Sequence, residues 1–228
     1  MPAERYERFH ERLSDPVLTV LTLMLSFLLF VIGPMQTAGI VTEHHFGSFF
    51  GLVLIPACFL YSKNLFVAGP IAVAIILVIV ISLLDLEGSP RLDLYLDSAA
   101  WLIAGLALIV VVGRAVFGPG PITYHRVVGA VLLYLNIGLV FVAFYGFVAL
   151  SVPDAFTNLA TRQGDFAIAG NLIYFSFVTL TTTGYGDIAP LHPYARSLAN
   201  IEAIIGPIYP ATLLARLVTL ELTNKGGS

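Results

Sequence analysis

The stretch VTLTTTGYGD, from Val178 to Asp187, is polar and rich in glycine, and it lies in a chain made mostly of apolar residues. Of the 228 residues, 58% are hydrophobic and 11% are charged, and the mean hydropathy is +0.91. A soluble domain carries roughly 25% charged residues, so lipid rather than water must be the main solvent of this chain. The composition therefore indicates a membrane protein, in which the polar stretch needs an explanation.

Six apolar segments are long enough to cross a bilayer, since about 30 Å of hydrocarbon takes roughly 20 helical residues. They cover about residues 17–40, 47–62, 65–86, 95–117, 124–151 and 195–221. The apolar segment before the polar stretch, GNLIYFSFVTL, is too short to span and predicts a re-entrant pore helix over residues 170–181. We expect an all-α membrane protein with six transmembrane helices and this pore helix.

The order of these segments predicts the organisation of the chain. A cytoplasmic segment over 1–16 precedes a four-helix domain over 17–117, and a Gly-Pro-rich linker over 118–123 leads to a pore domain over 124–221 and a tail over 222–228. Lysine and arginine favour the cytoplasmic side of a membrane. With both termini cytoplasmic, eight of the eleven Lys and Arg residues lie inside. We therefore expect a multi-pass protein of the cell membrane, and the compact chain suggests a prokaryotic one.

The polar stretch is best explained as the lining of a pore, because irregular backbone at membrane depth must be buried in protein or face a water-filled path. Gly184 and Gly186 stand at alternate positions and permit left-handed backbone dihedrals. Alternating the hand of successive residues turns successive carbonyl groups to the same side. The resulting row of oxygen atoms can replace the water around a dehydrated cation.

VTLTTTGYGD resembles the selectivity-filter signature of potassium channels. The resemblance implies stacked K⁺ sites, with K⁺ as the bound ion and no organic cofactor. The ligands would be the Thr182 hydroxyl and the backbone carbonyls of Thr182, Thr183, Gly184 and Tyr185. Tyr185 would point away from the pore, Gly186 would complete the filter over 182–187, and Asp187 would lie at the outer mouth. Since the chain supplies one pore loop, the resemblance also implies a homotetramer.

The resemblance assigns support of the filter to the pore helix. The residues concerned are Tyr174, Phe175, Val178 and Thr179. Tyr174 and Phe175 occupy places often taken by two tryptophans, and Phe175 has no N–H with which to bond Asp187. Val178 stands where some members have a glutamate, and Thr183 stands where valine or isoleucine is usual. These departures leave the expected conduction chemistry intact.

The inner helix and the fourth span carry the expectations about gating. Gly206 lies where the resemblance places a hinge, and Pro207 and Pro210 each remove a helical hydrogen bond; a static kink is the alternative. A voltage sensor carries intramembrane arginines, but the fourth span has only Arg114, at its cytoplasmic end. We therefore expect little or no intrinsic voltage sensing.

Two packing expectations concern the spans. Asn136, in the fifth span, is expected to hydrogen-bond across helices, as polar residues in membranes often do. Small residues allow helices to approach closely. The glycines expected to serve this purpose are Gly69, Gly105, Gly113, Gly129, Gly138 and Gly146.

The sequence thus predicts a K⁺-selective channel that is not an enzyme, since no nucleophile with a base and no phosphate-binding loop is present. A non-selective cation channel and a non-conducting membrane regulatory subunit are the alternatives. The expected partners are further copies of the chain and the lipid bilayer, and an unidentified gating ligand or lipid stays open. The net charge of −3 offers no basic face for nucleic acid.

Overall fold

The computed structural model describes residues 17–37, 69, 73, 76, 90–118, 123–159 and 165–226. The chain is helical from Val17 and passes through a π-helical turn, η1, into a short helix. The elements are η1 (Leu28–Ile32), α2 (Gly33–Thr37), α5 (Pro90–Phe117), α6 (Tyr124–Ser151), α7 (Asp165–Leu180) and α8 (Pro193–Gly226). Apart from one bridge between Phe156 and Pro190, the described residues form helices and their connections.

Four described helices are long and apolar enough to cross a membrane. They are Val17–Met35, Ser98–Phe117, Tyr124–Ser151 and Pro193–Arg216, and Ile168–Leu180 is a shorter apolar helix. They correspond to the first, fourth, fifth and sixth predicted spans and to the predicted pore helix. The N-terminal segment 1–16, linker residues 119–122 and, except for residues 69, 73 and 76, the predicted spans 47–62 and 65–86 lie outside the described residues.

Several helices extend beyond their predicted bounds because polar residues and prolines suit helix ends. α5 begins at Pro90 rather than 95, and α8 begins at Pro193 rather than 195; proline is favoured in the first turn because its missing N–H would be unpaired there anyway. α7 begins at Asp165 rather than 170, where a carboxylate is stabilised by the helix dipole. α8 also continues to Gly226, through most of the predicted tail.

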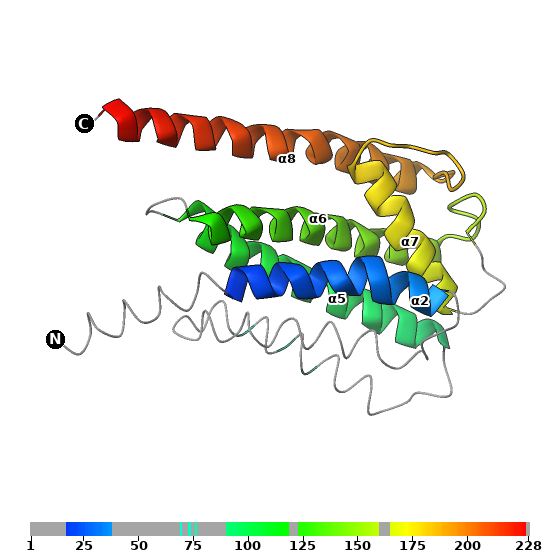
Figure 1. The fold of residues 1–228 in the computed structure, drawn as a ribbon. Helices are drawn as coiled ribbons and strands as arrows, with labels where there is room; N and C mark the ends of the chain where they lie inside the picture. Colours follow the sequence, from blue (N-terminus) through cyan, green and yellow to red (C-terminus); the bar gives the residue numbers. More distant parts are fainter. Residues whose placement is uncertain are drawn as a thin grey trace.

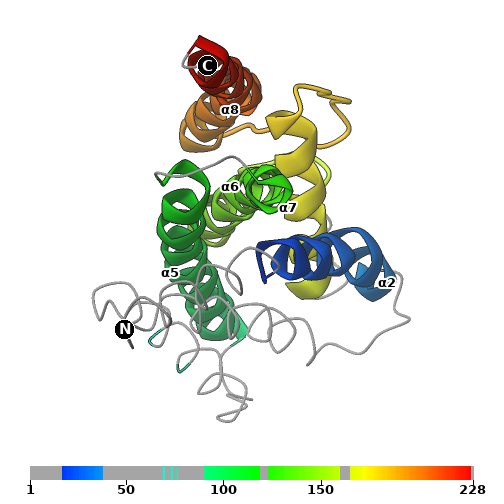
Figure 2. The same cartoon turned by 60° about the vertical axis from the view of Figure 1, so that its left-hand side comes forward.

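Among the described helices, α6 is central and contacts α5, α7 and α8. Figure 1 shows α8 running along the length of α6, with α7 crossing obliquely between them near one end. In the turned view of Figure 2, α8 lies at one edge of the bundle and α2 at the other, with α6 and α7 between. The segment that connects α7 to α8 therefore lies at one end of the bundle, beside the start of α8.

Close helix packing occurs at four of the predicted glycines. A Cβ atom on Gly105 would lie 2.7 Å from Val140 Cγ2, and Gly129, Gly138 and Gly146 are similarly crowded. Gly69 and Gly113 have nothing within 4 Å of such an atom, so these two glycines do not serve close packing within the described residues. The prediction for Asn136 is confirmed: its Nδ2 donates to the Gly105 carbonyl of α5 at 2.7 Å.

Candidate functional site

The sign of the backbone φ angle alternates from residue to residue between Thr182 and Gly186, in the polar stretch that follows α7. Thr182, Gly184 and Gly186 have φ angles of 57°, 55° and 78°, whereas Thr183 and Tyr185 do not have positive φ. A positive φ is costly for a β-branched residue such as Thr182, by about 1–3 kcal/mol, so surrounding bonds must hold it there. The alternation has the form expected for a row of carbonyl oxygens on one side of the loop.

The amide groups of the loop bond back to the last turn of α7. Thr183 N donates to the Val178 carbonyl at 2.9 Å, and Gly184 N donates to the same oxygen at 3.2 Å. Thr182 N donates to the Thr179 carbonyl at 2.9 Å. Val178 and Thr179 therefore contact the loop through their backbone carbonyl oxygens. These bonds supply the constraint that the positive φ of Thr182 requires.

The three threonine hydroxyls form local bonds. Thr181 Oγ1 donates to the Phe177 carbonyl at 2.7 Å and lies 2.9 Å from Thr183 Oγ1. Thr182 Oγ1 donates to the Thr181 carbonyl at 2.7 Å. A hydroxyl that donates its hydrogen keeps two lone pairs, so the Thr182 oxygen remains able to coordinate a cation.

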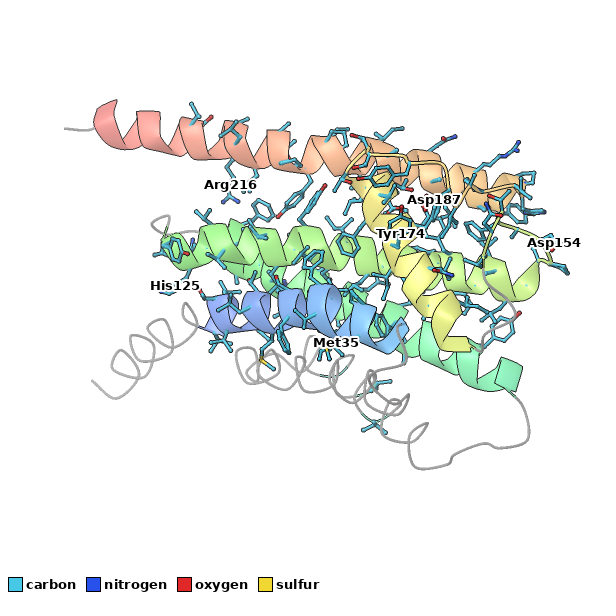
Figure 3. All side chains as sticks on the ribbon, turned by 45° about the vertical axis from the view of Figure 1, so that its right-hand side comes forward. Met35, His125, Asp154, Tyr174, Asp187 and Arg216 are labelled. Carbon is cyan, nitrogen blue, oxygen red and sulfur yellow. The ribbon has the colours of Figure 1, made fainter. Side chains whose placement is uncertain are left out.

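Tyr174 is hydrogen-bonded to Asp187 at the end of the loop. Its ring stacks on Tyr185 with centroids 6.5 Å apart and planes 2° apart. The Tyr174 hydroxyl donates a hydrogen bond to the Asp187 carboxylate, and this bond is the main cause that raises the pKa of Tyr174 above its ordinary value. Figure 3 shows Tyr174 and Asp187 close together where α7 meets the loop.

This bond corrects an expectation from the sequence, which considered Phe175 as the position facing Asp187. Phe175 is 5% exposed and packs against Tyr145 and Phe156, with ring centroids 5.0 Å and 5.4 Å away. Adjacent residues on an α-helix point about 100° apart, so only one of the pair can face the loop. Tyr174 faces Asp187, and Phe175 faces the interior.

The segment after the loop, at Asp187 and Ala189, is hydrogen-bonded to Thr157 and Asn158 in the connection that follows α6. Thr157 N donates to the Ala189 carbonyl at 2.8 Å, and Ala189 N donates to Thr157 Oγ1 at 2.9 Å. Asn158 Nδ2 donates to the Asp187 carbonyl at 2.8 Å. Sequence reasoning missed both residues. The residue type offered a weak signal, because asparagine tolerates the positive φ of 54° that Asn158 adopts.

A buried carboxyl group lies behind the loop and was also missed. Glu202 of α8 is 0% exposed, and its oxygens lie 2.6 Å from the Tyr145 hydroxyl of α6 and 2.6 Å from Ser176 Oγ of α7. The signal available in the sequence was its place in the apolar run ANIEAIIG, since an ionisable residue inside a membrane span is rare and marks function by default. Its partners are distant in sequence and became evident only in the fold.

The predicted hinge residues lie in a continuous helix. α8 passes through Pro207 and Pro210 without interruption. Gly206 is buried, and a Cβ atom there would overlap the Leu180 carbonyl oxygen and lie 2.8 Å from its carbonyl carbon. The absence of a side chain at Gly206 thus allows α8 to approach the end of α7. Bending at this position stays a prediction.

The opposite end of α8 is tied to α5. Arg216 Nη2 donates to the Phe117 carbonyl at 2.8 Å, and the guanidinium carbon lies 4.8 Å above the Phe117 ring. Figure 3 shows Arg216 at the same end of the molecule as His125 and far from Asp154. Arg216 therefore joins α8 to α5 at this end of the molecule.

No group of three His, Cys, Asp or Glu side chains within the described ranges could hold a metal ion. The loop from Thr181 to Asp187 is exposed in the single chain, and Tyr185 is 72% exposed. The oxygen atoms that this loop offers are backbone carbonyls, the threonine hydroxyls and, at its end, the Asp187 carboxylate. Carbonyl and carboxylate oxygens are the ligands that hard cations prefer.

Comparison with known proteins concerns the part of the chain that holds this site. Residues 129–221 match the family model described as "Ion channel". The chain is also similar to "Two pore potassium channel c" of Oryza sativa subsp. japonica, with 35% identity over 91 residues, which is 40% of this chain and 18% of that protein. No solved structure matches the chain significantly. With the four apolar helices, these similarities support a membrane ion channel.

Proposed function

We propose that the chain is one subunit of a homotetrameric, K⁺-selective channel whose filter is the loop from Thr182 to Gly186. The observation that carries this proposal is the alternation of backbone hand at Thr182, Gly184 and Gly186, directly after a short apolar helix. The match to the ion channel family over residues 129–221 and the similarity to a potassium channel support it. No enzymatic step is part of the proposal.

In this mechanism K⁺ sheds its water and is coordinated by the loop. The ligands are the carbonyls of Thr182, Thr183, Gly184 and Tyr185 together with the Thr182 hydroxyl. Because the amides of Thr182, Thr183 and Gly184 bond to α7, the loop keeps its shape while ions move through it. A preorganised row of oxygens avoids reorganisation each time an ion enters.

Two further features attract a cation to the loop and stabilise it there. Asp187 at the end of the loop places a carboxylate at the outer mouth, where a ring of such groups concentrates cations. The C-terminal end of α7, with its partial negative charge, lies directly before the loop. Both features favour a cation over an anion without selecting between K⁺ and Na⁺, so selection belongs to the carbonyl row.

The proposed site is incomplete in one chain, which supplies one loop and one row of oxygens. The loop and an apolar face of α8 are exposed in the monomer; the apolar residues include Ile201, Ile204 and Ile208. Copies arranged around an axis would enclose the ions and cover part of these surfaces. A closed cyclic arrangement of identical subunits is the usual solution for such a site.

Voltage sensing is not part of the proposed mechanism. The apolar window Ser98–Phe117 contains Arg114 as its single basic residue, and moving one charge through 100 mV contributes about 2.3 kcal/mol. One arginine at a helix end cannot supply a steep voltage response. We place the channel in the cell membrane with both termini cytoplasmic.

The testing experiment measures the reversal potential of purified protein in planar bilayers, with K⁺ on one side and Na⁺ on the other. We expect a value near the K⁺ equilibrium potential, and loss of selectivity or of current in Gly184→Ala and Gly186→Ala. Gly113→Ala is the matched control, because a Cβ atom there meets nothing within 4 Å. Equal permeability would indicate a non-selective pore. Assembled protein that never conducts would indicate a regulatory subunit.

A further inference from the structure

Glu202 of α8 connects this helix to α6 and α7 through hydrogen bonds. Tyr145 Oη of α6 donates to Glu202 Oε2 at 2.6 Å, and Ser176 Oγ of α7 lies 2.6 Å from Glu202 Oε1. Ser176 Oγ also lies 2.9 Å from the carbonyl oxygen of Gly138 in α6. The carboxyl group is completely buried. These contacts form one chain of hydrogen bonds through α6, α8 and α7 and back to α6.

The number of hydrogen atoms decides the protonation state of this chain. The Ser176 hydroxyl has one hydrogen, but it lies within bonding distance of two oxygens, Glu202 Oε1 and the Gly138 carbonyl. If Glu202 carries a proton on Oε1, that proton is donated to Ser176 Oγ, and Ser176 donates its own hydrogen to Gly138. Each short oxygen–oxygen contact then contains one hydrogen. An ionised carboxylate leaves one of these contacts without a hydrogen.

The surroundings of Glu202 agree with a neutral carboxylic acid. A buried charge is stable only when it is paired and fully hydrogen-bonded. In the described part of the chain, the groups that act on this carboxyl are the Ser176 and Tyr145 hydroxyls, with no cation among them. The titratable groups facing it are both phenols of α6: Tyr145 in contact and Tyr134 farther away. Among the described residues of α7, the group in contact with this carboxyl is the Ser176 hydroxyl.

We propose that Glu202 is a protonated positioning residue, which holds α7 in place behind the loop and releases it on ionisation. Ser176 lies two residues before Val178, whose carbonyl accepts the amides of Thr183 and Gly184. Loss of the Glu202 proton turns the Ser176 hydrogen toward the carboxylate and breaks the bond from α7 to Gly138. A rise in pH through the titration of Glu202 therefore loosens the support of the loop.

The first test measures the proton directly and does not depend on conduction. Infrared spectra of the purified protein at pH 7 are compared with those of Glu202→Gln. We expect the wild-type protein to show the carbonyl band of one protonated carboxylic acid per subunit, absent from Glu202→Gln and retained in Asp154→Asn. Asp154 is an exposed carboxyl in the left-handed region, where asparagine fits. Identical bands in wild type and Glu202→Gln would overturn the proposal.

The second test rests on the proposed function and follows K⁺ flux into liposomes from pH 7 to pH 10. Glutamine can accept from Tyr145 and donate to Ser176, so Glu202→Gln keeps the bonds but cannot ionise. We expect wild-type flux to fall by about tenfold per pH unit once the ionised form dominates, and Glu202→Gln to stay level. Equal profiles for the two proteins would refute the role in conduction while leaving the infrared result to stand by itself.

Thermal denaturation from about pH 5 to pH 10 provides a readout if neither protein conducts. An unfolded glutamate ionises at about pH 4.3, whereas Glu202 keeps its proton in the folded protein. We therefore expect the melting temperature of wild type to fall with rising pH until Glu202 ionises in the folded protein and then to level off, and that of Glu202→Gln to change less. Tyr145→Phe is a second variant with a small change in volume. The Tyr145 hydroxyl donates to the carboxylate and therefore favours its ionised form, so Tyr145→Phe should show the wild-type fall extended to higher pH. Parallel melting curves for wild type and Glu202→Gln would contradict the proposal.

Discussion

Replacing Gly206 with alanine puts a methyl group where the end of α7 already lies. The new Cβ atom would overlap the Leu180 carbonyl oxygen and lie 2.8 Å from the carbonyl carbon and 3.3 Å from Cα. Carbon atoms in contact are about 3.5 Å apart or more, so relieving the contact with the carbonyl carbon alone takes about 0.7 Å. Relieving the overlap with the oxygen requires α7 and α8 to separate further. Both neighbours are backbone, and neither can turn away as a side chain would.

The expected cost is near the upper end of the range for overpacking, about 3 kcal/mol, which is roughly a 100-fold change in an equilibrium constant. The displacement acts at Leu180, directly before the loop, so K⁺ flux should fall together with thermal stability. The assay measures both quantities on purified protein in matched detergent and liposomes.

Gly113→Ala serves as the control for this prediction. It changes the same residue type within a helix, but its Cβ atom has open space, and alanine favours a helix by about 1 kcal/mol over glycine. It should leave flux unchanged and stability equal or slightly higher. If Gly206→Ala matched Gly113→Ala in both stability and flux, the close approach of α8 to Leu180 would be wrong.

Three further contacts are tested by substitution. Tyr174→Phe removes the hydroxyl that is hydrogen-bonded to Asp187, so current should decay faster during sustained recording. Adding Asp187→Asn should change the decay rate little further, although it should lower the current because the carboxylate at the outer mouth is lost. Asn158→Gly keeps the positive φ but loses the bond to the Asp187 carbonyl, at a cost of about 1 kcal/mol, which a thermal melt would detect. Arg216→Lys keeps the charge but loses the planar contact with the Phe117 ring; single-channel open probability should change, and an unchanged value would argue against a link between α8 and α5.

The sequence predicted the helical spans well where length and apolarity decide the outcome. The four described spans and the short apolar helix fall at predicted positions because about 20 apolar residues have few other stable arrangements in lipid. Helix ends were less predictable, since Asp165 and Pro193 were counted with the connections although both residues suit a helix start. The backbone conformation of Gly184 and Gly186 followed from residue type.

Other parts of the site depend on the fold. The positive φ of Thr182 contradicts the preference of a β-branched residue, and bonds to α7 impose it. The choice between Tyr174 and Phe175 depends on a helix rotation that two adjacent aromatic residues do not define. The contacts of Glu202 with Ser176 and Tyr145 join residues 26 and 57 positions apart, and such contacts arise only when three helices are packed.

The hydrogen bond from Arg216 to the Phe117 carbonyl limits where the chain can be cut to give a stable pore fragment. A fragment that began after residue 118 would keep the whole region matched by the ion channel family, yet it would lack the carbonyl acceptor and the ring that hold the end of α8. It would also expose the surface around Gly129, which packs on Leu18 and Val116. The helices before the proposed pore are thus part of its scaffold, and an isolated pore fragment should need replacement contacts to assemble.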